Sequence, residues 1–231
     1  MEPRELTFEV TPEKGAVSAL LHLPEDADWL LVLGHGAGAG MRHRNLEAIA
    51  ARLAALRIGT LRYQFPFMER GGGRDSEAVS LTTVRRAVEE ARRHAQHRRL
   101  LAGGQSFGGR MTSLAAARPE GDDDPTQALA GLVYFNFPLH PPGRPGTKRA
   151  GHLGAIAQPQ LFLAGTRDPL AHLDLLRPVV DGIGPSARLH LIDTADHSFK
   201  VLKRTRQSPE DPIDEACRVV REWLDSILPP I

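Results

Sequence analysis

Apolar and polar side chains alternate along residues 5–23. In "ELTFEVT" the apolar positions are Leu6, Phe8 and Val10, and in "AVSALLHL" they fall on every second residue from Val17 to Leu23. Alternation with a period of two is typical of strands that bury one face, and the intervening "PEKG" favours a turn. The pattern therefore predicts a pair of antiparallel strands at the start of the chain.

The pattern changes at "WLLVLGHG", where residues 29–33 are all apolar. A continuous apolar run indicates a strand that is covered on both faces. Further strands are predicted in "IGTLRYQF", "RRLLAGG", "LAGLVYFNF", "PQLFLAG" and "ARLHLID". Helices are predicted in "NLEAIAARLAALR", "SEAVSLTTVRRAVEEARRHAQ", the segment 107–117 and "DPIDEACRVVREWLDSIL". Asn45 should cap the first of these helices. Strands that alternate with helices predict an α/β fold, a mostly parallel sheet with helices on both faces.

One serine lies among glycines in "LLAGGQSFGGRMTS", between a predicted strand and a predicted helix. Residues 104–108 read Gly-Gln-Ser-Phe-Gly, the G-x-S-x-G arrangement of a nucleophile elbow. In such a turn, small residues two positions before and after the serine permit a strained bend that exposes its hydroxyl. A flexible turn, or a helix cap at Ser106, is the alternative interpretation. The position directly after a strand favours Ser106 as a nucleophile.

A serine hydroxyl needs a neighbouring base, and the base needs a group that orients it. In hydrolases with this strand order, an acid and then a histidine follow the serine along the chain. Asp168 follows the strand "PQLFLAG", and His197 follows the last strand. Ligands of parallel sheets bind at the carboxyl ends of the strands, so we predict His197 as general base and acid and Asp168 as its orienting carboxylate. Asp168 as a helix cap, and Asp193 or Asp196 as the partner of His197, are alternatives.

Backbone N–H groups are expected to bind the oxyanion that forms on an attacked carbonyl. One is that of Phe107, which follows the proposed nucleophile. The other comes from "LGHGAGAG", where we favour Ala37, with Gly36 or Gly38 as alternatives. This segment lacks the Lys-Ser/Thr pair of a phosphate-binding loop and the spacing of a dinucleotide fingerprint. His35 is predicted to be structural.

The composition excludes several classes of function. A chain of 231 residues predicts one domain spanning 1–231. A net charge of +1 gives no global field that would attract nucleic acid or an anionic membrane. A single cysteine, Cys217, and an N-terminus too charged for a secretory signal predict a cytoplasmic protein. The histidines show no spacing such as H-E-x-x-H, so we expect no metal and no cofactor.

The segment "RRAVEEARRHAQHRR" is the most basic part of the chain. Its arginines are interleaved with Glu89 and Glu90, and it contains no aromatic residue on which a base could stack. Glu89 and Arg93 are spaced for an i,i+4 ion pair. The segment therefore predicts an exposed helix face and no binding of nucleic acid.

The motifs "GHGAGAG", "GQSFGG", "GTRD" and "DHSF" resemble those of α/β-hydrolases over about residues 5–228. "RYQFPFME" and "FNFPLHPPGRP" resemble a small dienelactone-hydrolase-related branch, which includes a testis-expressed animal protein and the hydrolase-like domain of a subunit of the NSL acetyltransferase complex. The resemblance implies an eight-stranded sheet and supports Ser106, Asp168 and His197 as a triad. Dienelactone hydrolases proper have a cysteine at the elbow, so their substrate is not carried over to this chain.

The segment between the strands "LAGLVYFNF" and "PQLFLAG" is too short for the helical lid of many lipases, which favours an open site and small soluble acyl substrates. The loops at the carboxyl edge of the predicted sheet contain several cationic residues: Arg42, Arg44, Arg74, Arg144, Lys148 and Arg149. We favour the interpretation that these residues form a solvated rim around the site, and the alternative is that they attract an anionic ester. The sequence as a whole predicts a serine hydrolase that cleaves a small carboxylic ester or thioester through an acyl-enzyme. The alternative is a non-catalytic binding or scaffold protein with the same fold.

Overall fold

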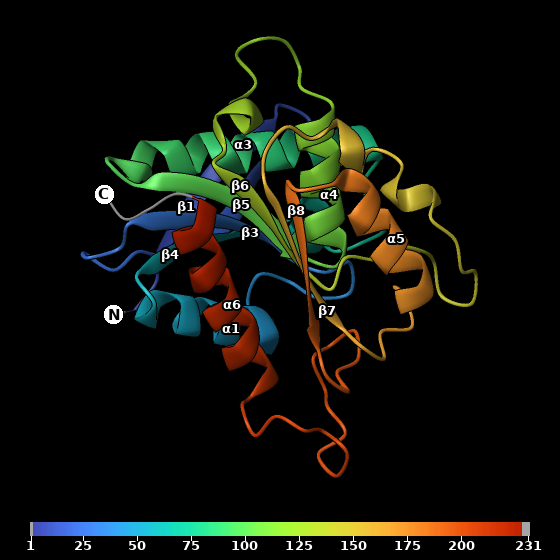
Figure 1. Ribbon diagram of the computed structural model, residues 1–231. Helices are drawn as coiled ribbons and strands as arrows, with labels where there is room; N and C mark the ends of the chain where they lie inside the picture. The colour runs from blue at the N-terminus through green and yellow to red at the C-terminus, as the bar shows by residue number, and fades with distance from the viewer. Residues whose placement is uncertain (1, 228–231) are drawn as a thin grey trace.

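An eight-stranded sheet forms the centre of the computed structural model, which describes residues 2–227 (Figure 1). The strands are β1 (Arg4–Thr11), β2 (Gly15–His22), β3 (Trp29–Gly34), β4 (Ile58–Tyr63), β5 (Arg99–Gln105), β6 (Gly131–Phe135), β7 (Gln160–Gly165) and β8 (Ala187–Ile192). Their spatial order is β1-β2-β4-β3-β5-β6-β7-β8. β2 pairs antiparallel with β1 and β4, and every other pair is parallel. The predicted mostly parallel sheet is confirmed.

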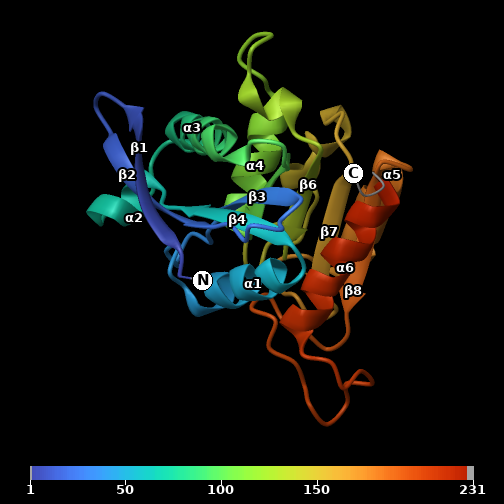
Figure 2. The ribbon, with the colours of Figure 1, turned by 90° about the vertical axis from the view of Figure 1, so that its left-hand side faces the viewer.

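Helices cover both faces of the sheet. They are α1 (Arg44–Ala55), α2 (Pro66–Arg70), α3 (Glu77–Ala95), α4 (Phe107–Ala117), α5 (Leu173–Ile183) and α6 (Pro212–Ile227). The buried side chains of α3, α4 and α5 belong to one apolar core, and those of α1 and α6 belong to a second core. The two layers are visible in Figure 2, where α1 and α6 lie on the opposite side of the sheet from α3 and α4.

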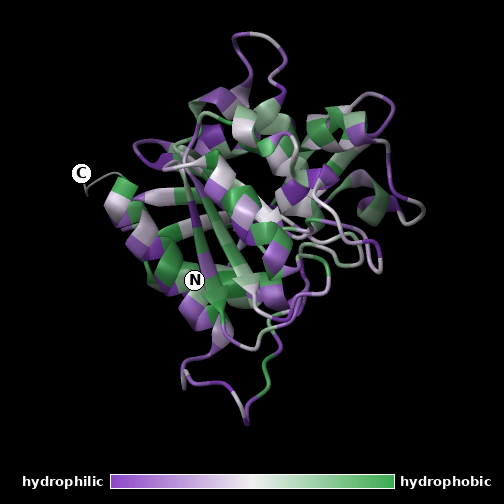
Figure 3. Ribbon diagram, turned by 45° about the vertical axis from the view of Figure 1, so that its right-hand side comes forward, coloured by the Kyte–Doolittle hydropathy of each residue, from purple (hydrophilic) through white to green (hydrophobic). Residues whose placement is uncertain are grey.

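The residues of β3 show why its sequence is continuously apolar. Leu30 and Val32 pack into the core under α3 and α4, whereas Leu31 and Leu33 pack into the core under α1 and α6. Both faces of the strand are therefore buried, as expected for a central parallel strand. In Figure 3 green segments are common in the sheet and on the helices, while the outer loops are mainly purple or white.

One local expectation about the helices is wrong, and one longer helix was not predicted. The N-cap of α1 is His43, whose Nδ1 accepts a hydrogen bond of 3.3 Å from the N–H of Asn45, so Asn45 lies inside the helix. The helix α5 was not expected, because Pro178 and Gly182 within it weaken the helical pattern. It forms because Leu176 and Val180, one turn apart, are buried against the sheet.

The charged face of α3 is only partly exposed. Arg85 is buried, and its guanidinium binds Asp124 at 2.6 Å and Glu120 at 2.8 Å. The expected pair between Glu89 and Arg93 is wrong, because Glu89 pairs with Arg86 three residues earlier, and Arg93 pairs with Glu90. Most arginines of this helix therefore form ion pairs with carboxylates of the protein itself.

The parallel strands bring distant parts of the sequence to one edge. Ser106 directly follows β5, Asp168 lies three residues beyond β7, and His197 lies five residues beyond β8. Because parallel strands all point the same way, these positions share the carboxyl edge of the sheet. Within residues 2–227, no helix is both long and apolar enough to cross a bilayer.

Candidate active site

Ser106 occupies a sharp turn between β5 and α4. Its backbone has φ +51° and ψ −111°, a region that residues with a side chain rarely adopt. The flanking glycines permit the turn: a Cβ added to Gly104 would lie 2.6 Å from the carbonyl oxygen of Gly34, and one added to Gly108 would lie 2.3 Å from the Gly34 carbonyl carbon. The strained turn is held by the close approach of β3, which pairs Gly34 with Gly104.

The side chains of Ser106, His197 and Asp168 form a chain of hydrogen bonds. The distance from Ser106 Oγ to His197 Nε2 is 2.8 Å, and that from His197 Nδ1 to Asp168 Oδ2 is 2.7 Å. An ionised carboxylate only accepts, so Nδ1 carries the ring proton and Nε2 is left to accept from the hydroxyl. The Asp168 side chain is 0% exposed and that of His197 is 21% exposed, so solvent reaches the imidazole while the carboxylate is shielded.

The structure also bears on the alternative interpretations of these residues. The Ser106 side chain does not cap α4, since its oxygen bonds to His197 instead. Asp168 does cap a turn, because its Oδ1 accepts from the N–H of Leu170 at 2.8 Å, but its other oxygen faces His197. Asp196 accepts from two backbone N–H groups of its own loop, and Asp193 accepts from the N–H of Gln207. These last two carboxylates shape the loop around His197.

Two asparagines hold the loop that carries His197. Asn136 Nδ2 donates to the carbonyl oxygen of His197 at 3.1 Å, and Asn45 Nδ2 donates to that of Ser198 at 3.0 Å. Asn136 is fully buried, has φ +56°, and accepts from the N–H of Gly165 at 3.1 Å. It therefore joins the ends of β6 and β7 to the histidine loop. Sequence reasoning missed this role, although an asparagine directly after a buried strand was a usable signal.

We expect Asn136→Asp to lower both stability and hydrolysis. The substitution keeps the acceptor for Gly165 but replaces the donor to His197 with an oxygen that repels the His197 carbonyl. Loss of a buried hydrogen bond of this kind costs about 1–3 kcal/mol. Urea unfolding and kcat/KM for a chromogenic ester would measure the two effects. The matched variant Asn45→Asp removes the bond to Ser198, and an equal loss of kcat/KM in both variants would contradict a specific role of Asn136 at His197.

His35 is a buried structural residue beside the elbow. Its Nδ1–H donates to the carbonyl oxygen of Gly36 at 2.8 Å, and its Nε2 accepts from the N–H of Phe65 at 3.0 Å. Burial lowers the pKa of His35 to about 4, so the ring is neutral near pH 7. Its own carbonyl accepts from the N–H of Gly108 at 3.0 Å. His35 therefore joins the glycine-rich loop to the N-cap residue of α2 and to the first turn of α4.

Free backbone N–H groups lie near Ser106. Within residues 2–227, no protein acceptor binds the N–H of Phe107, nor that of Gly36, Ala37 or Gly38. The glycine-rich loop is adjacent to the serine, since a Cβ added to Gly36 would lie 3.9 Å from Ser106 Cβ. The loop and the N-terminus of α4 thus offer donors on the same side of the elbow.

The connection between β6 and β7 forms no helical lid. Residues 136–159, which connect β6 and β7, contain only two short 3₁₀ turns, η2 (Lys148–Ala150) and η3 (Leu153–Ala155).

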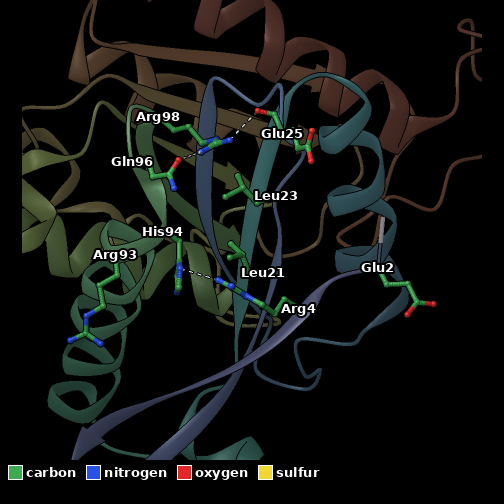
Figure 4. A pocket seen from close by; sticks show the side chains of 9 residues that line it. All are labelled: Glu2, Arg4, Leu21, Leu23, Glu25, Arg93, His94, Gln96 and Arg98. Atoms are coloured by element: carbon green, nitrogen blue, oxygen red, sulfur yellow. Dashed lines mark hydrogen bonds between the residues drawn. The ribbon is translucent and has the colours of Figure 1, made fainter.

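Two hollows lie elsewhere on the surface. One, of about 390 Å³, lies between β1 and the end of α3, where Arg4 and His94 share a hydrogen bond of 3.0 Å (Figure 4). Another, of about 710 Å³, is lined by residues of the loop 199–212 that follows His197.

The sequence matches the family described as "Alpha/beta hydrolase domain" over residues 27–225. The chain belongs to this family. The predicted resemblance to α/β-hydrolases is thereby confirmed, and the protein is a hydrolase acting on a small-molecule substrate.

Solved structures share the fold of this hydrolase over nearly its whole length. A serine hydrolase without lid from Xanthomonas campestris is 19% identical, with a TM-score of 0.75 and coverage of 100% of this chain and 97% of that chain. A dienelactone hydrolase from Anabaena variabilis is 18% identical, with a TM-score of 0.73 and coverage of 98% and 99%. The esterase domain of a Rhodothermus marinus protein is 15% identical, with a TM-score of 0.71 and coverage of 98% and 99%. These similarities concern the fold.

Proposed function

We propose that this hydrolase cleaves a small carboxylic ester or thioester through an acyl-enzyme. Ser106 is the nucleophile, His197 is the general base and acid, and Asp168 orients the imidazole. The observation that carries the proposal is the continuous hydrogen bonding from Ser106 Oγ through both ring nitrogens of His197 to the buried Asp168. This arrangement activates a hydroxyl that is otherwise a weak nucleophile.

In the first half of the reaction, Ser106 Oγ attacks the carbonyl carbon while its proton moves to His197 Nε2. Negative charge develops on the carbonyl oxygen, and the N–H groups of Phe107 and Ala37 are the proposed donors to it. When the tetrahedral intermediate collapses, the bond to the leaving alcohol or thiol breaks and His197 donates its proton to that group. The acyl group is then bound to Ser106.

In the second half, a water molecule attacks the acyl carbon and gives a proton to His197 Nε2. The second tetrahedral intermediate collapses by breaking the bond to Ser106 Oγ, which takes the proton back from His197. The products are the free carboxylic acid and the restored enzyme. Asp168 stays ionised throughout and stabilises the imidazolium that forms in each half.

The short connection between β6 and β7 supports a small, soluble substrate. A lipase that works at an oil–water interface covers its site with a mobile helical segment, and residues 136–159 offer only η2 and η3. We therefore propose hydrolysis of dissolved acyl compounds, with no rise in activity at an interface.

A fluorophosphonate probe tests the proposed chemistry directly, because it labels only a serine that a neighbouring base activates. We expect the wild-type protein to be labelled at Ser106 and the His197→Ala variant to lose the label. Circular dichroism and thermal melting would establish that both proteins are folded. Folded wild-type protein that takes up no label would favour the non-catalytic scaffold over the enzyme.

A further inference from the structure

Three arginines from three different segments gather near the elbow. The Arg74 guanidinium carbon lies 6.0 Å from the centre of the Phe107 ring. Arg110 lies one helical turn beyond Ser106, whose carbonyl oxygen accepts from the Arg110 N–H at 3.0 Å. Arg149 lies in η2 and is close enough for its charge to interact with those of Arg110 and Arg74. We refer to these three residues as the arginine cluster.

The arginine cluster has few counter-charges. Arg110 Nη2 lies 3.5 Å from Glu77 Oε2, and Glu77 is shared with Arg118 at 3.0 Å. In the part of the chain that the structure describes, no carboxylate lies within 4.0 Å of a guanidinium nitrogen of Arg74 or Arg149. Burial, followed by the charges of Arg110 and Arg74, lowers the pKa of Arg149. The cluster therefore carries an excess of positive charge that the protein itself does not neutralise.

One donor of the cluster is buried without an acceptor. Arg110 Nε has no hydrogen-bond partner within residues 2–227, although it is inaccessible to solvent. His152, the neighbouring titratable side chain, adds no further positive charge, because burial, Arg110 and Arg118 lower its pKa to about 4 and leave it neutral near pH 7. A buried guanidinium N–H without a partner is costly, and an anion bound beside it would lower that cost.

Arginines that stabilise this fold are bound differently. Arg85 binds two carboxylates and a backbone carbonyl, and Arg206 binds Glu215 and three backbone carbonyls. Among the residues that the structure describes, Arg74 and Arg149 have no such set of acceptors, and Arg74 lies beside the ring of Phe107, the residue that follows the nucleophile. Guanidinium groups are well suited to carboxylate and phosphate, which they bind through paired N–H donors.

We propose that the arginine cluster binds a carboxylate or phosphate group at the non-reacting end of the substrate, so that the enzyme prefers anionic esters or thioesters. This inference rests on the proposed function of Ser106, because the anion is placed relative to that nucleophile. The net charge of the chain is only +1, so the protein as a whole does not attract anions. The attraction for an anionic substrate is therefore confined to the arginine cluster.

Matched chromogenic esters test the preference. The mono-p-nitrophenyl ester of adipic acid and p-nitrophenyl hexanoate have equal chain lengths and differ in the terminal carboxylate, and p-nitrophenyl 5-phosphonopentanoate presents a phosphonate at the same position. We expect kcat/KM of the wild-type enzyme to be about 10-fold or more higher for a charged ester than for the neutral one, mainly through KM. The preference should shrink as salt is added. The better of the two charged esters shows whether carboxylate or phosphate is the preferred group.

Variants locate the effect. Arg149→Gln and Arg74→Gln should each lower the ratio of charged to neutral kcat/KM by about 5-fold or more. Arg92→Gln is the matched control, because it removes the same charge from the opposite end of the sheet, beside Leu100 at the start of β5, and should leave the ratio unchanged. Equal kcat/KM for charged and neutral esters, or a ratio that neither cluster variant changes, would overturn the inference.

A binding experiment separates this inference from the proposed function. Calorimetric titration of the Ser106→Ala variant with adipate requires no turnover, and binding should weaken when Arg149→Gln is added. If wild-type protein hydrolyses no ester but adipate binds through the cluster, the proposed function fails and the anion site stands. If hydrolysis depends on Ser106 but adipate does not bind, the anion site fails alone.

Discussion

Ser106→Ala is expected to lower kcat for a p-nitrophenyl ester by about 10⁴–10⁶-fold, because the oxygen that forms the acyl bond is removed. The remaining rate over water would come from the backbone donors and from substrate positioning. The thermal midpoint should change little, since the Ser106 side chain has one hydrogen-bond partner, His197, in the described part of the protein. Steady-state kinetics and a melting curve on the same preparation measure both quantities.

Ser198→Ala is the matched control for this experiment. Ser198 is exposed, directly follows His197, and its hydroxyl has no partner within residues 2–227, so its loss should leave kcat within a few-fold. Retained activity in Ser106→Ala would remove Ser106 as the nucleophile. Equal losses in the two variants would mean that the assay reports damage to the loop and not the chemistry.

Asp168→Asn is expected to cost about 10⁴-fold in kcat while the protein stays folded. The structure gives the reason. Asp168 Oδ1 accepts from the N–H of Leu170, so an asparagine would keep its oxygen there and direct its NH₂ group at His197 Nδ1. The ring would then carry its proton on Nε2, which faces Ser106 and could no longer accept the hydroxyl proton. Kinetics with a chromogenic ester would measure the loss.

Asp196→Asn is the control for Asp168→Asn. Within residues 2–227, its carboxylate accepts only from the N–H groups of Ser198 and Lys200, and an amide oxygen can still accept from both. A change of a few-fold or less is expected. If Asp196→Asn and Asp168→Asn lose the same activity, the assignment of Asp168 as the group that orients His197 is wrong.

The sheet and the position of the site followed from short-range patterns. Alternation at residues 5–23 identified strands that are buried on one face, and the apolar run at residues 29–33 identified a strand that is buried on both faces. This was possible because the number of buried faces determines which positions of a strand are apolar. Ser106, Asp168 and His197 were found because each follows a strand and parallel strands share one carboxyl edge. Their hydrogen-bonded arrangement is a structural result, and their catalytic roles are still predictions.

Contacts between distant segments could not be predicted in the same way. Asn45 was expected to cap α1, yet its side chain reaches Ser198, and Asn136 reaches His197 from the end of β6, two strands away from β8 in the sheet. The place of Asn136 directly after a buried strand marks it for attention, but nothing local in the sequence identifies the partner of either amide. Likewise, α5 forms in spite of Pro178 because packing of Leu176 and Val180 on the sheet outweighs the weak local preference.

The late position of His197 in the chain has a consequence for biosynthesis. Ser106 and His197 are separated by 91 residues, and the histidine is carried by the loop after the final strand. A growing polypeptide that has completed α5 already contains the serine and the aspartate, but without the imidazole its hydroxyl is no more reactive than that of an ordinary alcohol. Reactivity arises only when the ribosome has delivered β8 and the loop beyond it, so translation products that end before His197 would lack an activated serine.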